Sequence, residues 1–170
     1  SSVNFSIISA EIFLLVALCV IMIVDLFQRD KERKLTFLLT QLSLVSLFVM
    51  GAQDLGLERQ VGYSEHWIKD QFSTVLKLAI YLGTFVALLY ARPFIRERNL
   101  MRGEYYLLTL FSVLGMMIMV SANSLLVVYL GLELLSLSLY ALVALQRDSN
   151  IASESAVKYF VMGGLASGFL

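Results

Sequence analysis

Residues 125–145 read LLVVYLGLELLSLSLYALVAL, an apolar run long enough to cross the hydrocarbon core of a bilayer as a helix. Glu133 lies near the middle of this run. It is the only acidic or basic residue between Glu104 and Arg147. A carboxyl group near the centre of a bilayer is costly unless it is neutral or paired. Glu133 therefore marks a membrane helix and is by default a candidate functional residue.

The composition extends this reading to the whole chain. Of its 170 residues 59% are hydrophobic and only 15% are charged, and the mean hydropathy is +0.80. Soluble domains are less apolar and more charged. The formal net charge is zero, so bulk charge predicts no nucleic-acid partner. The sequence has one cysteine and no metal-ligand spacing, so any chemistry must rest on charges placed in lipid.

Six membrane spans can be drawn from the apolar runs, which predicts an all-α, polytopic helix bundle forming one membrane domain over residues 1–170. The expected spans are 5–27, 35–53, 72–91 (stopped by Arg92-Pro93), 105–121, 124–145, and a sixth that begins near 153 and is still running at Leu170. One helix over 105–145 would be roughly 60 Å long, about twice the thickness of a bilayer core. The polar stretch 121–124 is therefore read as a turn between two antiparallel helices.

The loops predict an orientation. The odd-numbered loops hold nine basic residues and the even-numbered loops hold two. The nine are Arg29, Lys31, Arg33, Lys34, Arg92, Arg96, Arg98, Arg102 and Arg147, and the two are Arg59 and Lys69. Because basic loops stay on the cytoplasmic side, the N-terminus is predicted to lie outside and the loop 54–70 to be external.

Glu133 shares one helical face with other polar residues of its span. Tyr129, Ser136 and Tyr140 lie four before, three after and seven after it. Desolvation disfavours a charged carboxyl and a nearby cation favours it, so a group balanced between the two can relay protons. The alternative is a protonated Glu133 that only hydrogen-bonds a neighbouring helix.

Lys158 lies inside the sixth span, with Glu154 one turn before it in the favourable order for an ion pair. Both are candidates for the relay, Lys158 the stronger. A structural alternative is that Lys158 extends to the membrane surface and Glu154 merely neutralises it. The run 162–168, MGGLASG, has small residues that let another helix approach closely.

Three further charges lie near the ends of spans. Lys77 is a weaker relay candidate, because it is five residues into its span and is expected to extend to the membrane surface. Glu11 and Asp25 are read as interfacial acids near the two ends of the first span. Asp25 and Arg29 are spaced for an i,i+4 ion pair.

Two blocks of sequence carry a resemblance to a known family. They are 130–140, LGLELLSLSLY, and 153–160, SESAVKYF, with a looser third at 104–108, EYYLL. Together they resemble the antiporter-like membrane subunits of respiratory complex I. The resemblance covers the whole chain as the N-terminal part of a larger subunit, and the family's proton-path glutamate and lysine fall on Glu133 and Lys158.

The resemblance also implies a setting. The chain would be a multi-pass protein of the bacterial inner membrane, with lipid and the other membrane subunits of the complex as partners. It would translocate protons as a subunit of a proton-pumping NADH:quinone oxidoreductase. FMN, iron–sulfur clusters and quinone would belong to other subunits, so no cofactor is expected in this chain. Two alternatives remain open: a subunit of a multisubunit cation/proton antiporter, and a structural membrane subunit without a relay.

Overall fold

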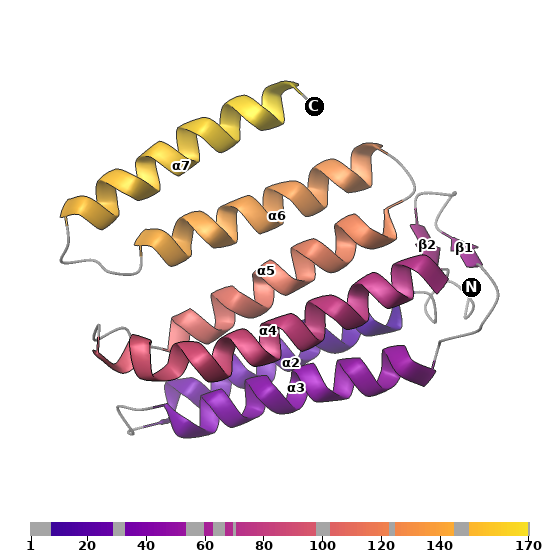
Figure 1. Cartoon of the computed structure of the whole chain (residues 1–170), viewed down its shortest axis with the longest axis horizontal. Coiled ribbons are helices and arrows are strands. Elements are labelled where there is room, and N and C mark those ends of the chain that lie inside the picture. Colours follow the sequence, from indigo (N-terminus) through magenta and orange to yellow (C-terminus); the bar gives the residue numbers. More distant parts are fainter. Residues whose placement is uncertain are drawn as a thin grey trace.

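The computed structural model describes residues 8–28, 33–53, 60–62, 67–69, 71–97, 103–122, 125–144 and 150–169. Its elements in chain order are α2 (Ser9–Leu26), α3 (Lys34–Gln53), β1 (Gln60–Gly62), β2 (Trp67–Lys69), α4 (Gln71–Glu97), α5 (Gly103–Ser121), α6 (Leu125–Ala144) and α7 (Asn150–Phe169). Each of the six expected spans corresponds to one helix. The helices run up and down side by side, which confirms the predicted helical bundle (Figure 1).

Five of the described helices are long and apolar enough to cross a membrane. These segments are Ser9–Leu26, Lys34–Gln53, Phe72–Pro93, Gly103–Ser121 and Leu125–Leu142. In the described part of α7, the apolar stretch is Phe160–Phe169. The outer faces of these helices carry many exposed apolar side chains, such as Leu15, Leu42 and Leu130. In a membrane, side chains that face lipid are as apolar as those in the core. The prediction that the N-terminus lies outside stays a prediction.

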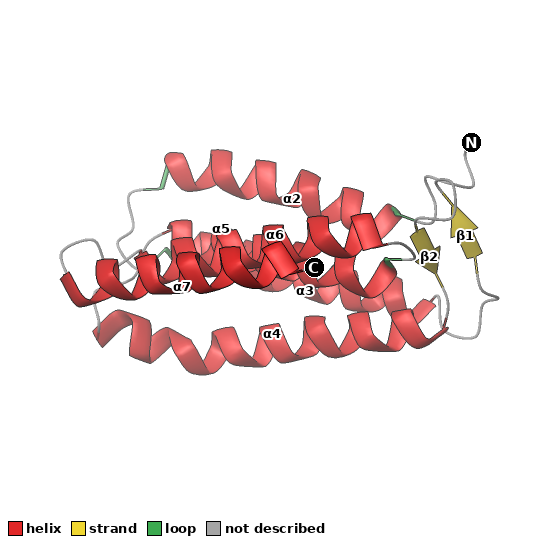
Figure 2. Ribbon diagram, turned by 90° about the horizontal axis from the view of Figure 1, so that it is seen from above, coloured by secondary structure: helices red, strands yellow, loops and turns green. Residues whose placement is uncertain are grey.

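Helix α5 lies at the centre of the bundle. It packs against α2, α3 and α4 on one side and against α6 on the other, whereas the principal neighbour of α7 is α6 (Figure 1). The core is built from apolar side chains of α2, α3, α4 and α5, namely Leu14, Leu18, Ile21, Leu44, Leu47, Tyr81, Leu88, Tyr106, Leu110, Val113, Leu114 and Met117. Seen from above, the same helices remain roughly parallel to one long axis (Figure 2).

Many hydroxyl groups inside the bundle are satisfied within their own helix. Thr40 donates to the carbonyl of Thr36, and Ser43 donates to that of Leu39, each at 2.8 Å. Thr109 and Ser138 do the same on α5 and α6, also at 2.8 Å. Such bonds leave the helical backbone continuous and remove the cost of an unsatisfied hydroxyl in an apolar environment.

The apolar part of the third span ends at Pro93, close to the predicted end, but the helix α4 continues through Pro93 to Glu97. Proline removes one backbone donor and strains the preceding turn, but near a helix end neighbouring contacts can compensate. Arg92 supplies such contacts: its Nη1 donates to the Tyr106 hydroxyl at 2.8 Å, and its guanidinium carbon lies 4.4 Å from the centre of the Phe37 ring. Helix α4 is thus fastened to α3 and α5 where its backbone is weakest.

The connection between α3 and α4 contains a short antiparallel hairpin that the sequence pattern did not predict. Strands β1 and β2 pair Gln60 with Lys69 and Gly62 with Trp67. The hairpin lies at the end of the bundle where α4 begins and α5 ends (Figure 1).

Candidate functional site

Two glycines fix the position of α6, the helix that carries Glu133. A Cβ atom on Gly131 would lie 2.7 Å from Cγ of Met119, and one on Gly115 would lie 2.8 Å from the backbone nitrogen of Leu135. Real Cβ atoms do not approach other atoms so closely. The two glycines therefore let the backbones of α5 and α6 come together, as small residues do between membrane helices.

Glu133 meets α7 through a serine. The Ser167 hydroxyl donates a hydrogen bond to Oε1 of Glu133, and Ser167 is only 9% exposed. A carboxylate accepts such a bond without a proton of its own, and a hydroxyl can both donate and accept. The structure thus gives Glu133 a hydrogen-bonding partner on the neighbouring helix.

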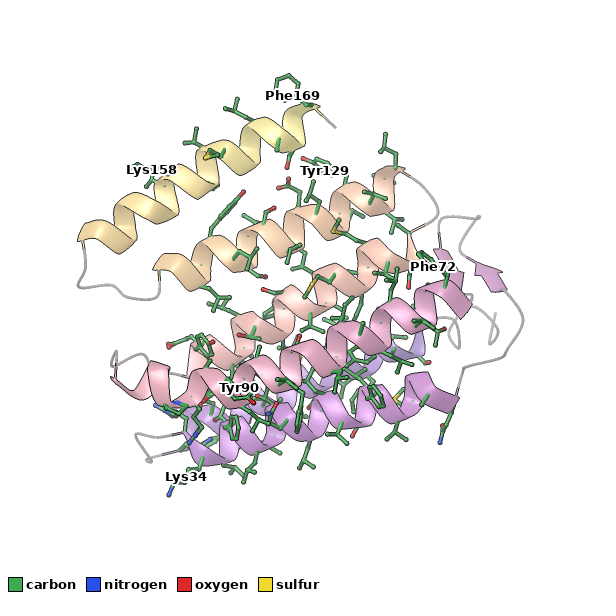
Figure 3. The ribbon with its side chains drawn as sticks, viewed as in Figure 1. Lys34, Phe72, Tyr90, Tyr129, Lys158 and Phe169 are labelled. Atoms are coloured by element: carbon green, nitrogen blue, oxygen red, sulfur yellow. The ribbon has the colours of Figure 1, made fainter. Side chains whose placement is uncertain are left out.

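The polar stripe of α6 faces α7 over much of its length. The ring of Tyr140 contacts that of Phe160 edge to face, with 5.8 Å between the ring centres. Gly163 leaves space for the Tyr140 hydroxyl, since a Cβ atom there would lie 1.2 Å from it. Tyr129, at the other end of the stripe, is 40% exposed (Figure 3). Glu133 and Tyr140 are thus the residues of this stripe that contact α7.

Lys158 and Glu133 are not brought together. Lys158 is exposed on α7 and precedes Ser167 by nine residues (positions 158 and 167). At 1.5 Å and about 100° per residue, this places it about 13 Å along the axis from Ser167 and on the opposite side of the helix. Because Ser167 is the residue that reaches Glu133, a lysine side chain at 158 points away from that carboxyl group (Figure 3).

Lys158 belongs to an exposed, otherwise apolar face of α7. Val161, Met162, Leu165 and Phe169 follow it at helical spacing and are 53%, 67%, 62% and 90% exposed. Glu154 lies in α7 one turn before Lys158, but its side chain lies outside the described residues.

Glu11 and Lys77 form a buried ion pair, which corrects the expectation for both. Nζ of Lys77 lies 2.5 Å from Oε1 of Glu11, and the two side chains are 11% and 7% exposed. Lys77 therefore turns inward from α4 to α2 and does not extend to the membrane surface. Desolvation makes either charge alone costly in this position, and the partner compensates for it.

Asp25 is also held differently from the expectation. Arg29, its expected partner, lies outside the described residues. Nη1 of Arg33 lies 3.3 Å from Oδ1 of Asp25, and the Thr36 hydroxyl donates to the same oxygen at 2.6 Å. The Asp25 carboxyl also packs against Gly103 at the start of α5, where a Cβ atom would lie 1.8 Å from Oδ2. Asp25 thus joins α2, α3 and α5 at this end of the bundle.

Three residues of these contacts, Ser167, Glu11 and Lys77, were missed or misread in the sequence. Ser167 carried no signal beyond its place among small residues. Glu11 and Lys77 carried one that could have found their pairing: opposite charges stand near the same end of two spans that run in the same direction. Within the described part of the chain, no group of three His, Cys, Asp or Glu residues could hold a metal ion.

The sequence and structure were compared with those of known proteins. Residues 122–170, which include Glu133 and Lys158, match a family described as NADH:quinone oxidoreductase/Mrp antiporter, transmembrane. The chain is 49% identical over 160 residues to NADH-quinone oxidoreductase subunit N of Nitrosomonas europaea, covering 94% of this chain and 33% of the relative. For subunit N of Alkalilimnicola ehrlichii the identity is 47% over 167 residues, with 98% and 34% covered.

A solved structure agrees with these relatives. The chain superimposes with a TM-score of 0.75 and 27% identity on a chain of respiratory complex I from Thermus thermophilus, solved with bound aureothin. The match covers 94% of this chain and 34% of that one. The chain thus spans about a third of the length of the relatives it matches. By sequence the chain is similar to NADH-quinone oxidoreductase subunit N, and by fold it is similar to a chain of respiratory complex I.

Proposed function

We propose that the chain is part of a proton-translocating subunit of NADH-quinone oxidoreductase, driven by NADH oxidation and quinone reduction elsewhere in the complex. The observation that carries this proposal is Glu133, an acid in the middle of a membrane helix whose Oε1 accepts a hydrogen bond from the next helix. Ionisable groups inside membranes commonly mark proton paths. The subunit N relatives and the matched family support the same function.

Glu133 and Lys158 are the principal relay residues in this proposal. Glu133, on α6, contacts one side of α7, and Lys158 lies on the opposite side of α7. A proton therefore passes between them only through intermediate groups. Ser136 and Tyr140 lie along α6 in the direction of Lys158, and their hydroxyls can donate and accept. Water is the other carrier. The negative charge of an ionised Glu133 attracts cations, and this attraction is strong where water is scarce.

Lys77 and Glu154 are weaker relay candidates. Lys77 faces Glu11 on α2, away from the contact between α6 and α7, so it would act at a separate place in the bundle. Glu154 has the sequence spacing to pair with Lys158 one turn later on α7.

The proposed setting is a multi-pass position in the bacterial inner membrane. Residues 1–170 form one membrane domain within a larger subunit there, in contact with lipid and with other membrane subunits of the complex. Flavin, iron–sulfur clusters and quinone are assigned to other subunits. The apolar outer surface of the described helices supports the membrane setting.

A second candidate is a subunit of a multisubunit cation/proton antiporter. The matched family covers antiporters as well as the oxidoreductase, and its match includes both Glu133 and Lys158. Sodium-dependent proton flux in vesicles without NADH would support the antiporter. The third interpretation is a structural subunit without a relay. It is supported by the hydrogen bond from Ser167, which gives one oxygen of Glu133 a partner.

The decisive experiment changes Glu133→Gln and Lys158→Met separately in the full-length subunit within the intact complex. Each variant is expected to assemble but to pump fewer protons, with slower coupled quinone reduction, because a relay group has been removed. Proton uptake by inverted membrane vesicles is measured against NADH oxidation, and native gels report assembly. Wild-type pumping in both variants contradicts the relay, and loss of assembly favours the structural reading.

A further inference from the structure

The Glu11–Lys77 pair is the most enclosed charged contact among the described residues, and the relay along α6 and α7 does not use it. It joins the third residue of α2 to the seventh of α4. One helical turn further into the bundle stand Leu14 and Tyr81, which are 0% and 1% exposed. The pair therefore borders directly on the apolar core, where electrostatic interactions are strong because water is excluded.

One atom of the pair has no partner. Lys77 donates a hydrogen bond to Oε1 of Glu11. The other carboxylate oxygen, Oε2, is buried and accepts no hydrogen bond from the described residues. Glu11 as a whole is only 5% exposed. A buried carboxylate oxygen without a donor is costly, and such groups in native proteins call for an explanation. A proton or a water molecule at Oε2 removes this cost.

Stability alone does not explain why the pair is present. Replacing a buried ion pair by well-packed apolar residues is often neutral or stabilising, whereas removing one partner is strongly destabilising. A leucine and a methionine would join α2 to α4 at least as well. Ionisable groups at such positions in membranes are usually retained for what their protons do.

We propose that Glu11 and Lys77 form a second proton-exchange site of this subunit, with Oε2 of Glu11 as the atom that receives the proton. The inference rests on the proposed function, because it assumes that the subunit moves protons. It differs in place, since it joins α2 to α4, and α5 lies between these helices and α6, which carries Glu133.

The exchange can be written as a balanced cycle. A protonated water gives its proton to Oε2, so that an O–H bond forms and the carboxylate becomes a carboxylic acid. Lys77 then releases one proton to another water, and its N–H bond breaks to leave a neutral amine. After a half-turn of the carboxyl group, Glu11 gives its proton to Nζ across the 2.5 Å contact. The ammonium–carboxylate pair is restored, and one proton has entered and one has left.

The test uses the full-length subunit in the intact complex. The double variant Glu11→Gln with Lys77→Met removes both charges together and leaves neither one buried alone. Its proton uptake per NADH oxidised is expected to fall by about half or more, while assembly on native gels is retained. Lys34→Met is the matched control, since Lys34 is an exposed lysine at the start of α3 (Figure 3). It is expected to pump as the wild type does.

Each outcome of the double variant is decisive. Normal pumping in an assembled double variant overturns the proposal and makes the pair a clamp between α2 and α4. Failure to assemble is resolved by Glu11→Asp, which keeps an acid at this position. The redox-induced infrared difference spectrum of Glu11→Asp must show a shifted carboxyl band, and an unchanged spectrum overturns the proposal.

The same membranes separate this inference from the proposed relay. Normal pumping by Glu133→Gln, with impaired pumping by the Glu11/Lys77 double variant, would remove the relay role of Glu133 and leave the exchange site standing. Impaired pumping by Glu133→Gln, with normal pumping by the double variant, would do the reverse.

Discussion

The bundle holds two buried or partly buried glutamates in opposite ways. Glu11 has a lysine from another helix at 2.5 Å, in a contact that borders on the fully buried core. Glu133 has a serine hydroxyl as its contact on α7, and the lysine expected to serve it lies exposed on the far side of that helix. The first glutamate is charge-compensated inside the described chain, while the second is only hydrogen-bonded there.

This difference shows what each region depends on. Removing charge from the contact between α2 and α4 disturbs the fold, because the remaining partner is left buried and alone. Removing the charge of Glu133 affects one hydrogen bond from Ser167 and leaves no opposite charge buried alone at the contact between α6 and α7. The loss of a single charge is therefore expected to lower stability far more in the first region than in the second.

The largest expected effect comes from Lys77→Met alone. It leaves Glu11 buried without its cation, which should destabilise the subunit by about 3–5 kcal/mol. Lys158→Met, the same change at an exposed lysine, should alter stability by no more than about 0.5 kcal/mol. The measurement is the midpoint of thermal unfolding of the solubilised complex, together with the yield of assembled complex. Equal effects of the two changes would contradict the contrast between the regions.

A smaller effect is expected where α6 meets α5. Gly131→Ala places a methyl group against Met119 and the carbonyl of Gly115, and overpacking of this kind costs about 1–3 kcal/mol. Because α6 then shifts, the bond from Ser167 to Glu133 should weaken as well. Gly164→Ala is the control, since no atom lies within 4 Å of a Cβ atom there, and it should leave thermal stability unchanged or slightly raised. A Gly131→Ala variant as stable as the control would show that α6 is not fixed by α5.

The smallest expected effect on stability, about 1 kcal/mol, comes from Ser167→Ala, which removes one hydrogen bond to Glu133. Its effect on function should be easier to see, because the carboxyl group loses its hydrogen-bond donor on α7. The infrared carboxyl band of Glu133 should shift, and proton uptake should slow with assembly unchanged. Ser167→Thr keeps the hydroxyl and should behave as the wild type. An unshifted band in Ser167→Ala would remove Ser167 from the site.

The number and type of helices could be predicted from the sequence, because span length and apolar composition are fixed by the bilayer itself. The break between two spans at the polar residues 121–124 was also predictable, since α5 ends at Ser121 and α6 begins at Leu125. The end of α4 was not predicted: the helix runs beyond Pro93 to Glu97, and Arg92, beside the proline, contacts Phe37 and Tyr106 on other helices. The hairpin between α3 and α4 left no clear apolar alternation to detect.

The candidate site was predictable to a lesser extent. The sequence identified Glu133 and the face of α6 that it occupies, because both follow from position along one helix. The sequence could not identify Ser167 as the hydrogen-bond partner of Glu133. That contact depends on how α7 is rotated about its own axis relative to α6. The sequence placed Lys77 near the start of the third span, but it did not give the direction of its side chain, which depends on Glu11 of another helix.

The 66 residues that separate Glu11 from Lys77 have a consequence for biosynthesis. At about 5–20 residues per second, a ribosome takes roughly 3–13 s to make this stretch. Thr40, Ser43 and Ser138 can enter lipid at once, because their hydroxyls bond within their own helices. Glu11 must wait for α4 to arrive, either uncharged or kept in contact with water. Helix α2 is therefore expected to stay at the insertion machinery until the third span has been synthesised, so these two helices leave it together.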